Sequence, residues 1–575
     1  MSWQNNYQEW QEFNNLASNL KEELALIEND EKKLEDAFYA PLEFGTAGMR
    51  GFIGVGINRM NIYTVRQATE GLALLMSSKG EAEKKRGVAI AYDSRHFSPE
   101  FAMEAGKVLA KHDIPSFIFE SLRPTPELSF AVRELNALTG IMITASHNPA
   151  PYNGYKVYGE DGAQMPPHDA DALTEFIRGI ENPLTIEVAD EAEAKANGLI
   201  QIIGDEIDNK YLELIKAVTI NSELVKTVGK DLKLVFTPLH GTGEMLGRRA
   251  LAQAGFEQIK VVEAQAIPDG DFPTVKSPNP EAKSAFNLAI ELGKKEDADV
   301  LIATDPDADR LGVAVRTEDG DYTVLTGNQI GAILTKYILE AHKQAGTLPQ
   351  NAAIIKSIVS SELPTVIADS YGVETQNVLT GFKFIAEKIE HFEETGSNTY
   401  MFGFEESYGY LIKPFVRDKD AIQAALLTAE VVAFYKAQGK TLYDGLQEIF
   451  KEYGYFAERT ISVTLSGIDG SAKIKKIMDK FRKSAPEKLN NTNVVTTEDF
   501  LELTKVTSDG QVEKLTTPPS NVLKYQLADG SWVAVRPSGT EPKIKFYLAT
   551  QSDSFEAAEA KLDVLEHEIN EIVGE

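Results

Sequence analysis

The chain has 575 residues, contains no cysteine and carries a net charge of −29. This length exceeds one hydrophobic core, so several domains are expected, and the missing cysteine excludes disulfides and thiolate metal sites and favours a cytoplasmic location. The negative charge argues against nucleic acid or an anionic membrane as a partner. Residues 421–435, the most apolar long stretch, are too few to span a membrane, and residues 1–9 lack the apolar segment of a secretory signal.

The first part of the chain predicts helices followed by a mainly parallel sheet. Apolar positions recur every three or four residues over 3–39, which predicts helical structure. Strand and helix patterns then alternate, as in an α/β domain. The expected strands are 87–93, 117–120 and 138–143, with a helix at 99–111.

A glycine-rich connector at residues 44–51 surrounds Arg50. Small residues beside a cation let the backbone approach an anion closely. A plain linker has the same composition, so both interpretations stay open at this point.

The stretch Thr-Ala-Ser-His-Asn-Pro at residues 144–149 follows the third expected strand and runs through a predicted turn, with Asn153 and Gly154, to Lys156. It places the Ser146 hydroxyl just past a strand end, where open α/β sheets carry their chemistry. Three interpretations compete: a polar turn, a serine hydrolase, and a serine that carries a phosphoryl group. The hydrolase fits poorly because the G-x-S-x-G elbow is absent and adjacent side chains point in different directions. A phosphoserine would need a metal and substrate-binding cations.

Residues 232–263 resemble a dinucleotide-binding unit, with a strand, a glycine turn, a helix and a second strand. The glycines Gly241, Gly243 and Gly247 are spaced G-x-G-x-x-x-G, which is one residue too long for that fingerprint. We therefore predict a tight strand-to-helix turn rather than the NAD site of an oxidoreductase.

Three aspartates, Asp305, Asp307 and Asp309, alternate at the end of an expected strand. In an extended segment they would face the same side and repel one another unless a cation lay among them. Ligands that are all oxygen favour Mg²⁺ or a similar hard ion, and a phosphoryl group on Ser146 would supply a further ligand. A calcium-binding EF-hand does not fit because Arg310 occupies its glycine position, and a solvated acidic turn is the remaining alternative.

A phosphate-ester substrate would require a local cluster of cations, against the overall charge of the chain. Arg310 and Lys156 are the cations that the sequence places nearest the aspartates and Ser146. Other candidates lie in or beside glycine-containing loops, namely Arg50, Lys383, Arg536 and Lys545.

The composition changes after about residue 455. Short strands and a hairpin turn at 528–531 predict a small α+β domain that ends in an amphipathic helix at 555–572. The expected strands are 460–465, 522–527, 532–536 and 543–548. Further helices are expected at 169–181, 206–217, 326–345 and 420–438.

Four stretches, 144–149, 305–310, 403–407 and 536–545, together resemble the signature loops of the α-D-phosphohexomutases. The resemblance covers about residues 44–547, and Gly-Phe-Glu-Glu-Ser at 403–407 is similar to the glucose-type loop of the branch that contains phosphoglucomutases and phosphopentomutases. It implies three related α/β domains and a small C-terminal α+β domain around a central cleft. The expected boundaries are 1–205, 206–320, 321–450 and 451–575.

The resemblance also implies a role for each site residue. Ser146 would be the phosphoserine, and with Asp305, Asp307 and Asp309 it would hold one Mg²⁺ per chain. The sugar hydroxyls would be bound by Glu405 and Ser407, and the non-reacting phosphate by Arg536, Ser538, Gly539 and Thr540, with Lys545 beside them. The cleft would be lined by Arg310, Thr380, Gly381 and Lys383. The acid/base or positioning candidates are Lys156, His147 and Arg50. Lys156 is favoured because Gly409 stands where some relatives have a histidine.

The implied reaction interconverts glucose 1-phosphate and glucose 6-phosphate through the enzyme phosphoserine and bound glucose 1,6-bisphosphate. A hinge at about 446–458 would close the last domain and exclude water. Alternatives are a phosphomannomutase, a phosphopentomutase, a metal-dependent sugar-phosphate phosphatase and a non-catalytic sugar-phosphate-binding protein. The partners would be small-molecule sugar phosphates alone, and the protein would be a monomer or homodimer.

Overall fold

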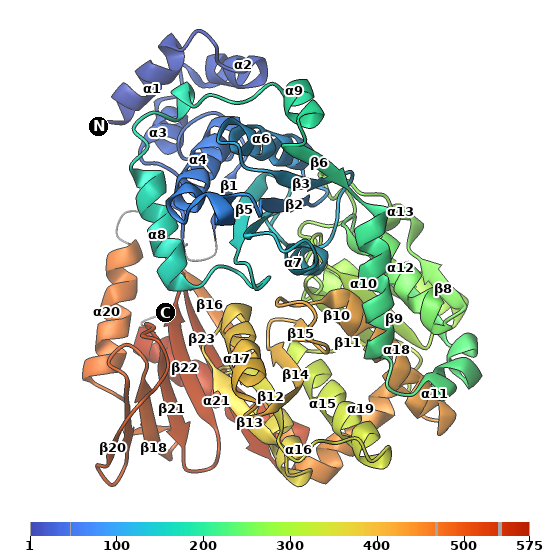
Figure 1. Ribbon diagram of the computed structural model, residues 1–575. Helices are drawn as coiled ribbons and strands as arrows, with labels where there is room; N and C mark the ends of the chain where they lie inside the picture. The colour runs from blue at the N-terminus through green and yellow to red at the C-terminus, as the bar shows by residue number, and fades with distance from the viewer. Residues whose placement is uncertain (1, 46–47, 466–469, 539–542, 574–575) are drawn as a thin grey trace.

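The computed structural model describes residues 2–45, 48–465, 470–538 and 543–573. These residues form four β-sheets that follow one another along the chain, and each sheet with its helices makes one domain, numbered I to IV (Figure 1). The sheets of domains I to III combine parallel and antiparallel pairs, whereas the sheet of domain IV is antiparallel throughout. The expected α/β class with a smaller C-terminal α+β domain is confirmed.

Separate helices precede the first sheet, namely α1 (Trp3–Glu12), α2 (Ser18–Ile27) and α3 (Glu31–Phe38). The sequence predicts helix throughout 3–39, but the helix breaks twice. Asn14 and Asn15 form a turn after α1, and the Asp30 side chain caps α3 by accepting from the Lys33 amide. Both residue types favour turns and caps over helix interiors. The apolar faces pack around Trp10 and reach Tyr63 of the first domain.

Domain I has the sheet order β1-β5-β4-β2-β3-β6, in which β4, β2, β3 and β6 run parallel. The predicted turn through Asn153 and Gly154 is wrong, because both residues belong to β5, which returns antiparallel to β4. Strand β6 was not predicted from the sequence. The strands are β1 (Met49–Phe52), β2 (Val88–Tyr92), β3 (Ser116–Phe119), β4 (Thr139–Ile143), β5 (Tyr152–Tyr158) and β6 (Ile200–Ile203). The helices are α4 (Ile62–Ser78), α5 (Glu81–Lys84), α6 (Ser98–Lys111), α7 (Thr125–Glu134), α8 (Pro167–Arg178) and α9 (Glu191–Ala196).

Domain II has the order β11-β10-β9-β7-β8. Its glycine turn is the tight strand-to-helix turn that was predicted. A Cβ on Gly241 would lie 2.4 Å from the Pro306 Cα, so this glycine makes room for the aspartate loop. The strands are β7 (Lys233–Thr237), β8 (Gln258–Val261), β9 (Val300–Thr304), β10 (Leu311–Arg316) and β11 (Tyr322–Val324). The helices are α10 (Asp205–Ile215), α11 (Ser222–Thr227), α12 (Gly243–Ala254), α13 (Glu263–Ala266) and α14 (Asn287–Glu296).

Domain III has the order β13-β12-β14-β15, with β15 antiparallel to its neighbour. The predicted helices at 326–345 and 420–438 are confirmed as α15 and α18. The strands are β12 (Ala352–Ser357), β13 (Glu374–Val378), β14 (Thr399–Glu405) and β15 (Gly409–Leu411). The helices are α15 (Gly327–Gln344), α16 (Leu363–Ser370), α17 (Phe382–Thr395), α18 (Ala421–Ala437) and α19 (Leu442–Tyr453).

Domain IV has the order β16-β23-β22-β21-β18-β19-β20, and β17 pairs with β18. Strands β17 to β20 were not predicted; they are short or polar, and β20 is exposed throughout. The strands are β16 (Tyr455–Thr464), β17 (Lys488–Leu489), β18 (Thr492–Asp499), β19 (Thr504–Thr507), β20 (Val512–Lys514), β21 (Leu523–Leu527), β22 (Trp532–Pro537) and β23 (Lys543–Ser552). The helices are α20 (Gly470–Lys483) and α21 (Phe555–Val573). Single 3₁₀ turns elsewhere are Pro183–Thr185, Lys216–Val218, Gly229–Asp231 and Lys283–Phe286.

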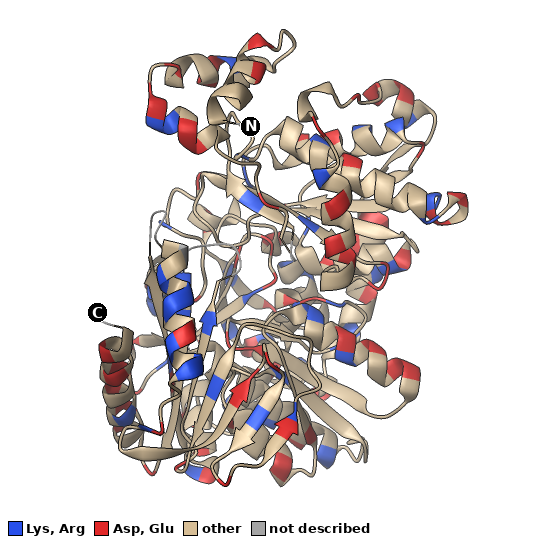
Figure 2. Ribbon diagram, turned by 90° about the vertical axis from the view of Figure 1, so that its left-hand side faces the viewer, with Lys and Arg blue, Asp and Glu red and all other residues tan. Residues whose placement is uncertain are grey.

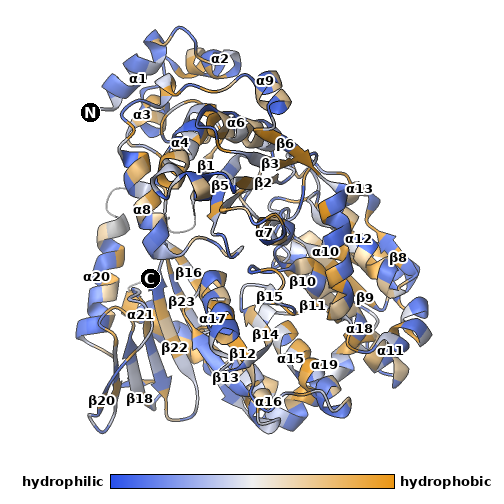
Figure 3. Cartoon of the chain, in the orientation of Figure 1, coloured by the Kyte–Doolittle hydropathy of each residue, from blue (hydrophilic) through white to orange (hydrophobic). Residues whose placement is uncertain are grey.

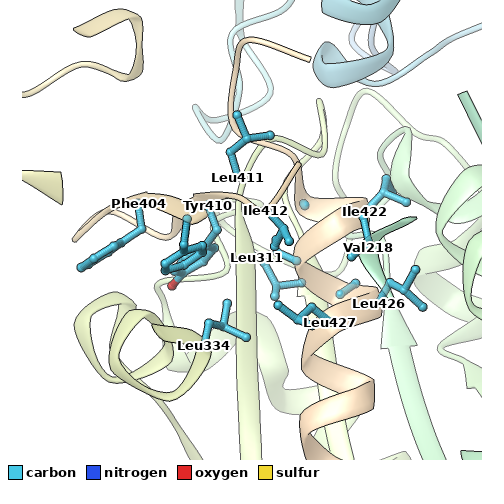
Figure 4. Close-up of a cluster of buried hydrophobic side chains, with 14 of the residues drawn as sticks. Val218, Leu311, Leu334, Phe404, Tyr410, Leu411, Ile412, Ile422, Leu426 and Leu427 are labelled. Carbon is cyan, nitrogen blue, oxygen red and sulfur yellow. The ribbon is translucent and has the colours of Figure 1, made fainter. Parts of the chain in front are cut away.

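One buried hydrophobic cluster runs through domains I, II and III, whereas the sheet and helices of domain IV enclose a separate one. Helix α18 is buried along nearly all its length and packs against α12 of domain II and α15 and α19 of domain III. Figure 4 shows Leu427 of this helix beside Leu311 of domain II and Ile412 of domain III. The α18 carboxylate Glu430 accepts hydrogen bonds from the Ile220 and Asn221 amides and from a tyrosine hydroxyl of α15. Domains II and III therefore share their packing through α18.

Apolar residues gather in the sheets and in the packed faces of the helices, and polar residues cover the outer helices (Figure 3). Acidic and basic residues both occur along the ribbon of the outer helices (Figure 2). Across residues 2–573, apart from the short gaps, no helix has the length and apolarity that a membrane crossing requires.

Replacing Leu427 by alanine should destabilise the shared core of domains II and III. Leu427 is fully buried, and deleting such a side chain leaves a cavity that lowers the free energy of unfolding by about 2–5 kcal/mol. Urea unfolding followed by circular dichroism measures the change. Leu26→Ala is the matched control because Leu26 is 85% exposed, and the two variants showing equal stability would contradict the assignment of α18 to the core.

Candidate functional site

Ser146 lies directly after β4 in a strained and strongly held conformation. Its φ of 50° is left-handed, which is unfavourable by roughly 1–2 kcal/mol for a residue with a side chain. The Ser146 amide donates to the Thr144 hydroxyl (2.8 Å), which in turn donates to Asp93 (2.6 Å). The Ser146 Oγ donates to Asp305 Oδ2 of domain II over 2.7 Å. The structure therefore brings the predicted serine and the predicted aspartate loop together.

The three aspartates cluster, but not for the reason that the sequence suggested. Residues 305–309 form a turn rather than an extended segment, and Ala308 at its centre has a φ of 50°. One carboxylate oxygen from each aspartate lies within 4.8 Å of the others. Within the described part of the chain, Asp307 Oδ1 and Asp309 Oδ1 are buried without a hydrogen-bond partner. Buried carboxylate oxygens that converge without partners fit a divalent metal ion.

Two buried lysines from other domains already face this cluster. Lys156 Nζ lies 2.9 Å from Asp307 Oδ2, because β5 returns antiparallel to β4 and carries it back to the serine. Lys419 of domain III lies 3.1 Å from Asp309 Oδ2. Lys419 was not predicted; its only signal is that a cation flanked by aspartates directly precedes an apolar helix. Thr125, also missed, donates to Asp307 Oδ2 (2.9 Å) from the start of α7, after the carboxyl end of β3.

The electrostatics of the aspartates show what a cation would change. Burial raises the pKa of Asp305 well above its ordinary value, and the charges of Asp307 and Asp309 raise it further. Burial also works against ionisation of Asp307, but the Lys156 ammonium and the hydrogen bonds with Lys156, Asp305 and Thr125 together lower the pKa of that carboxyl. A divalent ion among the three carboxylates would remove their mutual repulsion and keep all of them ionised.

His147 and Arg50 flank the serine on the domain I side. His147 Nδ1 lies 3.2 Å from Ser146 Oγ. Burial lowers the pKa of His147 well below its usual value, and Arg310 and Arg50 lower it further, so the imidazole is neutral at pH 7. Arg50 of β1 donates to Asn148 Oδ1 over 2.8 Å. This hydrogen bond joins β1 to the serine loop.

The predicted sugar loop reaches the aspartate loop through Arg310. Its guanidinium donates to Glu281 Oε1 (2.6 Å) and to the Ser407 carbonyl oxygen (3.1 Å). Glu405 at the end of β14 accepts from the Gly381 amide (2.7 Å), and burial raises the pKa of this carboxyl. The neighbouring Thr380 hydroxyl oxygen is buried and unpartnered among the residues described. Glu281 is a further residue that the sequence did not single out.

A cavity of about 340 Å³ opens beside the serine loop. Four cations line it, Arg50 from domain I and Arg536, Lys543 and Lys545 from domain IV. It is lined by Arg50, His147, Asn148, Pro149, Ser277, Arg536, Pro537, Ser538, Lys543 and Lys545. Ser277 of domain II donates to the His147 carbonyl (2.7 Å). Burial lowers the pKa of Lys383, and the Arg536 charge lowers it further, so Lys383 lies in the field of the same cations. The predicted residues Gly539 and Thr540 lie outside the described residues. This cavity supplies the local positive charge that a phosphate ester requires.

Comparison with known proteins assigns the chain and its fold to one family. Four family models match in chain order, described as phosphoglucomutase/phosphomannomutase alpha/beta/alpha domain I (residues 41–183), domain II (209–320), domain III (326–453) and C-terminal domain (492–567). The chain belongs to the phosphoglucomutase/phosphomannomutase family, that is, to the α-D-phosphohexomutases.

Close relatives cover nearly the whole chain. A phosphoglucomutase of Staphylococcus epidermidis is 42% identical over 532 residues, which are 92% of this chain and 94% of that protein. A phosphoglucomutase of Staphylococcus aureus is 40% identical over 533 residues, or 92% and 93% of the two chains. The crystal structure of the Paramecium phosphoprotein parafusin, a phosphoglucomutase in its open form, has the same fold, with a TM-score of 0.69 and 18% identity. The match covers 93% of this chain and 96% of parafusin.

A divalent cation should stabilise the protein through the aspartate cluster. Binding to the folded state alone at 100 times the dissociation constant adds about 2.7 kcal/mol to the free energy of unfolding. Thermal unfolding after EDTA treatment, repeated with increasing MgCl₂, measures this gain. Asp305→Asn should abolish it, whereas Asp319→Asn in an exposed turn should leave it unchanged. An equal gain in all three proteins would show that the cation acts elsewhere.

Proposed function

We propose that this protein interconverts glucose 1-phosphate and glucose 6-phosphate through a phosphoryl group carried on Ser146. The observation that carries the proposal is the 2.7 Å contact between Ser146 Oγ and Asp305 within a buried aspartate trio. A serine in that position can carry a phosphoryl group because the neighbouring lysines, and a metal held by the aspartate trio, would balance the charge. The phosphoglucomutase names of the Staphylococcus relatives support glucose as the sugar.

The metal of this proposal is one Mg²⁺ per chain, held by Asp305, Asp307, Asp309 and the phosphoryl group on Ser146. These ligands suit Mg²⁺ because all of them are hard oxygen atoms. They also leave coordination positions for water and for a substrate phosphate oxygen, which Mg²⁺ in proteins usually keeps. When bound, Mg²⁺ neutralises charge that develops on the transferring phosphoryl group. Lys156 and Lys419 add two protein charges to the same loop and hold its carboxylates in place.

The reaction is two phosphoryl transfers with one reorientation between them. Phosphoserine passes its group to O6 of glucose 1-phosphate, the O6 proton is lost and Ser146 Oγ gains one. The glucose 1,6-bisphosphate then turns within the site and returns its other phosphate to Ser146, leaving glucose 6-phosphate. The sequence favoured Lys156 for the proton transfer. We assign the exchange at Ser146 Oγ to neutral His147 instead, because it lies 3.2 Å away, whereas Lys156 is paired with Asp307 and orients the aspartate loop.

Binding the substrate in two orientations requires a phosphate site away from Ser146. The domain IV side of the cationic cavity provides it through Arg536, Ser538 and Lys545, with Arg50 facing them from domain I, and we assign Gly539 and Thr540 to the same phosphate. We assign Arg310, Thr380, Gly381 and Lys383 to the cleft, and Glu405 and Ser407 to the sugar hydroxyls. The phosphate grips hold the substrate near the attacking geometry in both directions.

The domain boundaries stay those expected from the sequence, except that β11 continues the second sheet to Val324, so we place the second boundary after this strand. The cytoplasmic location and the monomeric or homodimeric state remain predictions.

Ser146→Ala should abolish mutase activity while the protein stays folded. Loss of a covalent nucleophile lowers kcat by about 10³-fold or more. Formation of glucose 6-phosphate from glucose 1-phosphate, primed with glucose 1,6-bisphosphate, is the measurement. Ser116→Ala is the control, since that buried hydroxyl only donates to a backbone carbonyl. Substantial activity in Ser146→Ala would refute the nucleophile, and release of free phosphate by the wild type would indicate a phosphatase.

Glucose 1-phosphate should be the preferred substrate among glucose, mannose and pentose 1-phosphates. All three share the phosphate grips, so discrimination depends on hydroxyl contacts at Glu405 and Ser407. The ratio of kcat/KM for the three substrates measures it, and Glu405→Gln should reduce the preference by about tenfold, as expected for one charged contact. A higher kcat/KM for mannose or ribose 1-phosphate would reassign the protein within its family.

A further inference from the structure

Arg95 donates four hydrogen bonds to the backbone of the segment that carries Ser146. It follows β2 and is 1% exposed. Its Nη1 donates to the carbonyl oxygens of Pro149 and Tyr152, each at 3.0 Å. Its Nη2 donates to the carbonyl oxygens of Ser146 and Asn148, each at 2.5 Å. One guanidinium thus binds four carbonyls of the segment that carries the nucleophile.

Asp93 holds the amide side of Ser146, through Thr144, and also pairs with Arg95. Arg95 Nε lies 3.2 Å from Asp93 Oδ2, and the Arg95 amide donates to Asp93 Oδ1 (2.9 Å). The same carboxylate accepts from the Thr144 hydroxyl, to which the Ser146 amide donates. The amide and the carbonyl of Ser146 are therefore both held by one buried ion pair.

The guanidinium also contacts domain II. It lies over the Phe272 ring, 4.9 Å from the ring centroid, and Phe272 is itself buried with a φ of 46°. The adjacent His96 Nε2 lies 2.7 Å from Asp271 Oδ1. A planar cation on an aromatic face is favourable when it is desolvated, so docking of domain II supports the orientation of Arg95.

We propose that Arg95 is a positioning residue for phosphoryl transfer, which holds Ser146 Oγ toward Asp305 and makes that geometry depend on Phe272 of domain II. The inference rests on the proposed role of Ser146. A left-handed serine persists only where its surroundings determine it, and Arg95 and Asp93 are those surroundings. Transfer needs the reacting atoms in line, and a displacement of about 1 Å can slow an enzyme about 10²-fold. Lysine cannot replace the fork, because its single ammonium cannot reach four carbonyls.

Arg95→Lys tests the proposal in the full-length enzyme with glucose 1-phosphate. We expect kcat to fall about 100-fold with KM within about threefold, because the loop that presents Ser146 is displaced while the cations on the domain IV side of the phosphate cavity, Arg536 and Lys545, are not. The rate at which glucose 1,6-bisphosphate phosphorylates the protein, followed by intact-mass spectrometry, should fall in parallel. Arg66→Lys is the matched control: Arg66 also pairs with a buried carboxylate, Glu104, and lies over the Tyr63 ring, but in contact with helices away from the serine.

Phe272→Leu is the second variant, and it decides the outcome if Arg95→Lys does not fold. It leaves the hydrogen bonds of Arg95 in place and removes the ring beneath it, so kcat should fall about tenfold at unchanged KM. Wild-type kcat in a folded Arg95→Lys, or in Phe272→Leu, would overturn the proposal, as would an equal loss in Arg66→Lys. An inactive wild type would instead refute the proposed mutase function, so the two failures are distinguishable.

Discussion

The mutual repulsion of three buried carboxylates is the constraint on which the rest of the structure depends. Asp305, Asp307 and Asp309 cannot all stay charged in an apolar interior unless cations lie against them. Besides Arg310 of the same loop, the cations come from outside the domain of the aspartates, Lys156 from domain I and Lys419 from domain III. Neutralising the loop therefore requires three domains to meet, and the serine that contacts Asp305 arrives with the first of them.

The phosphate cavity likewise depends on cations that different domains bring together. A chain with a net charge of −29 repels an anionic substrate at long range, so affinity depends on cations gathered at short range. Arg50 comes from domain I, and Arg536 and Lys545 come from domain IV, whose core is separate. Domain IV thus contributes charge to the site while sharing little packing with domain I, an arrangement that allows a substrate to enter and leave.

Much of this site could be predicted from local sequence. The parts that could not be predicted are those that depend on packing between domains. Ser146 after a strand and the aspartate repeat were found because strand ends and carboxylate spacing are local patterns. The repeat was read as extended, whereas a left-handed Ala308 turns the loop, which no side-chain pattern indicates. Lys419 and Thr125 were missed because their meaning appears only when other domains bring Asp309 and Asp307 to them. The exposed strand β20 has no apolar alternation that could reveal it.

The position of α18 also bears on how the protein is made. This helix completes the packing of domain II, yet its residues, Ala421–Ala437, are translated long after β7–β11. Domains usually fold as units while the chain emerges from the ribosome. Here the second unit has to wait, with its apolar faces open, until residue 437 has left the exit tunnel, and this interval is when a nascent chain most needs a chaperone.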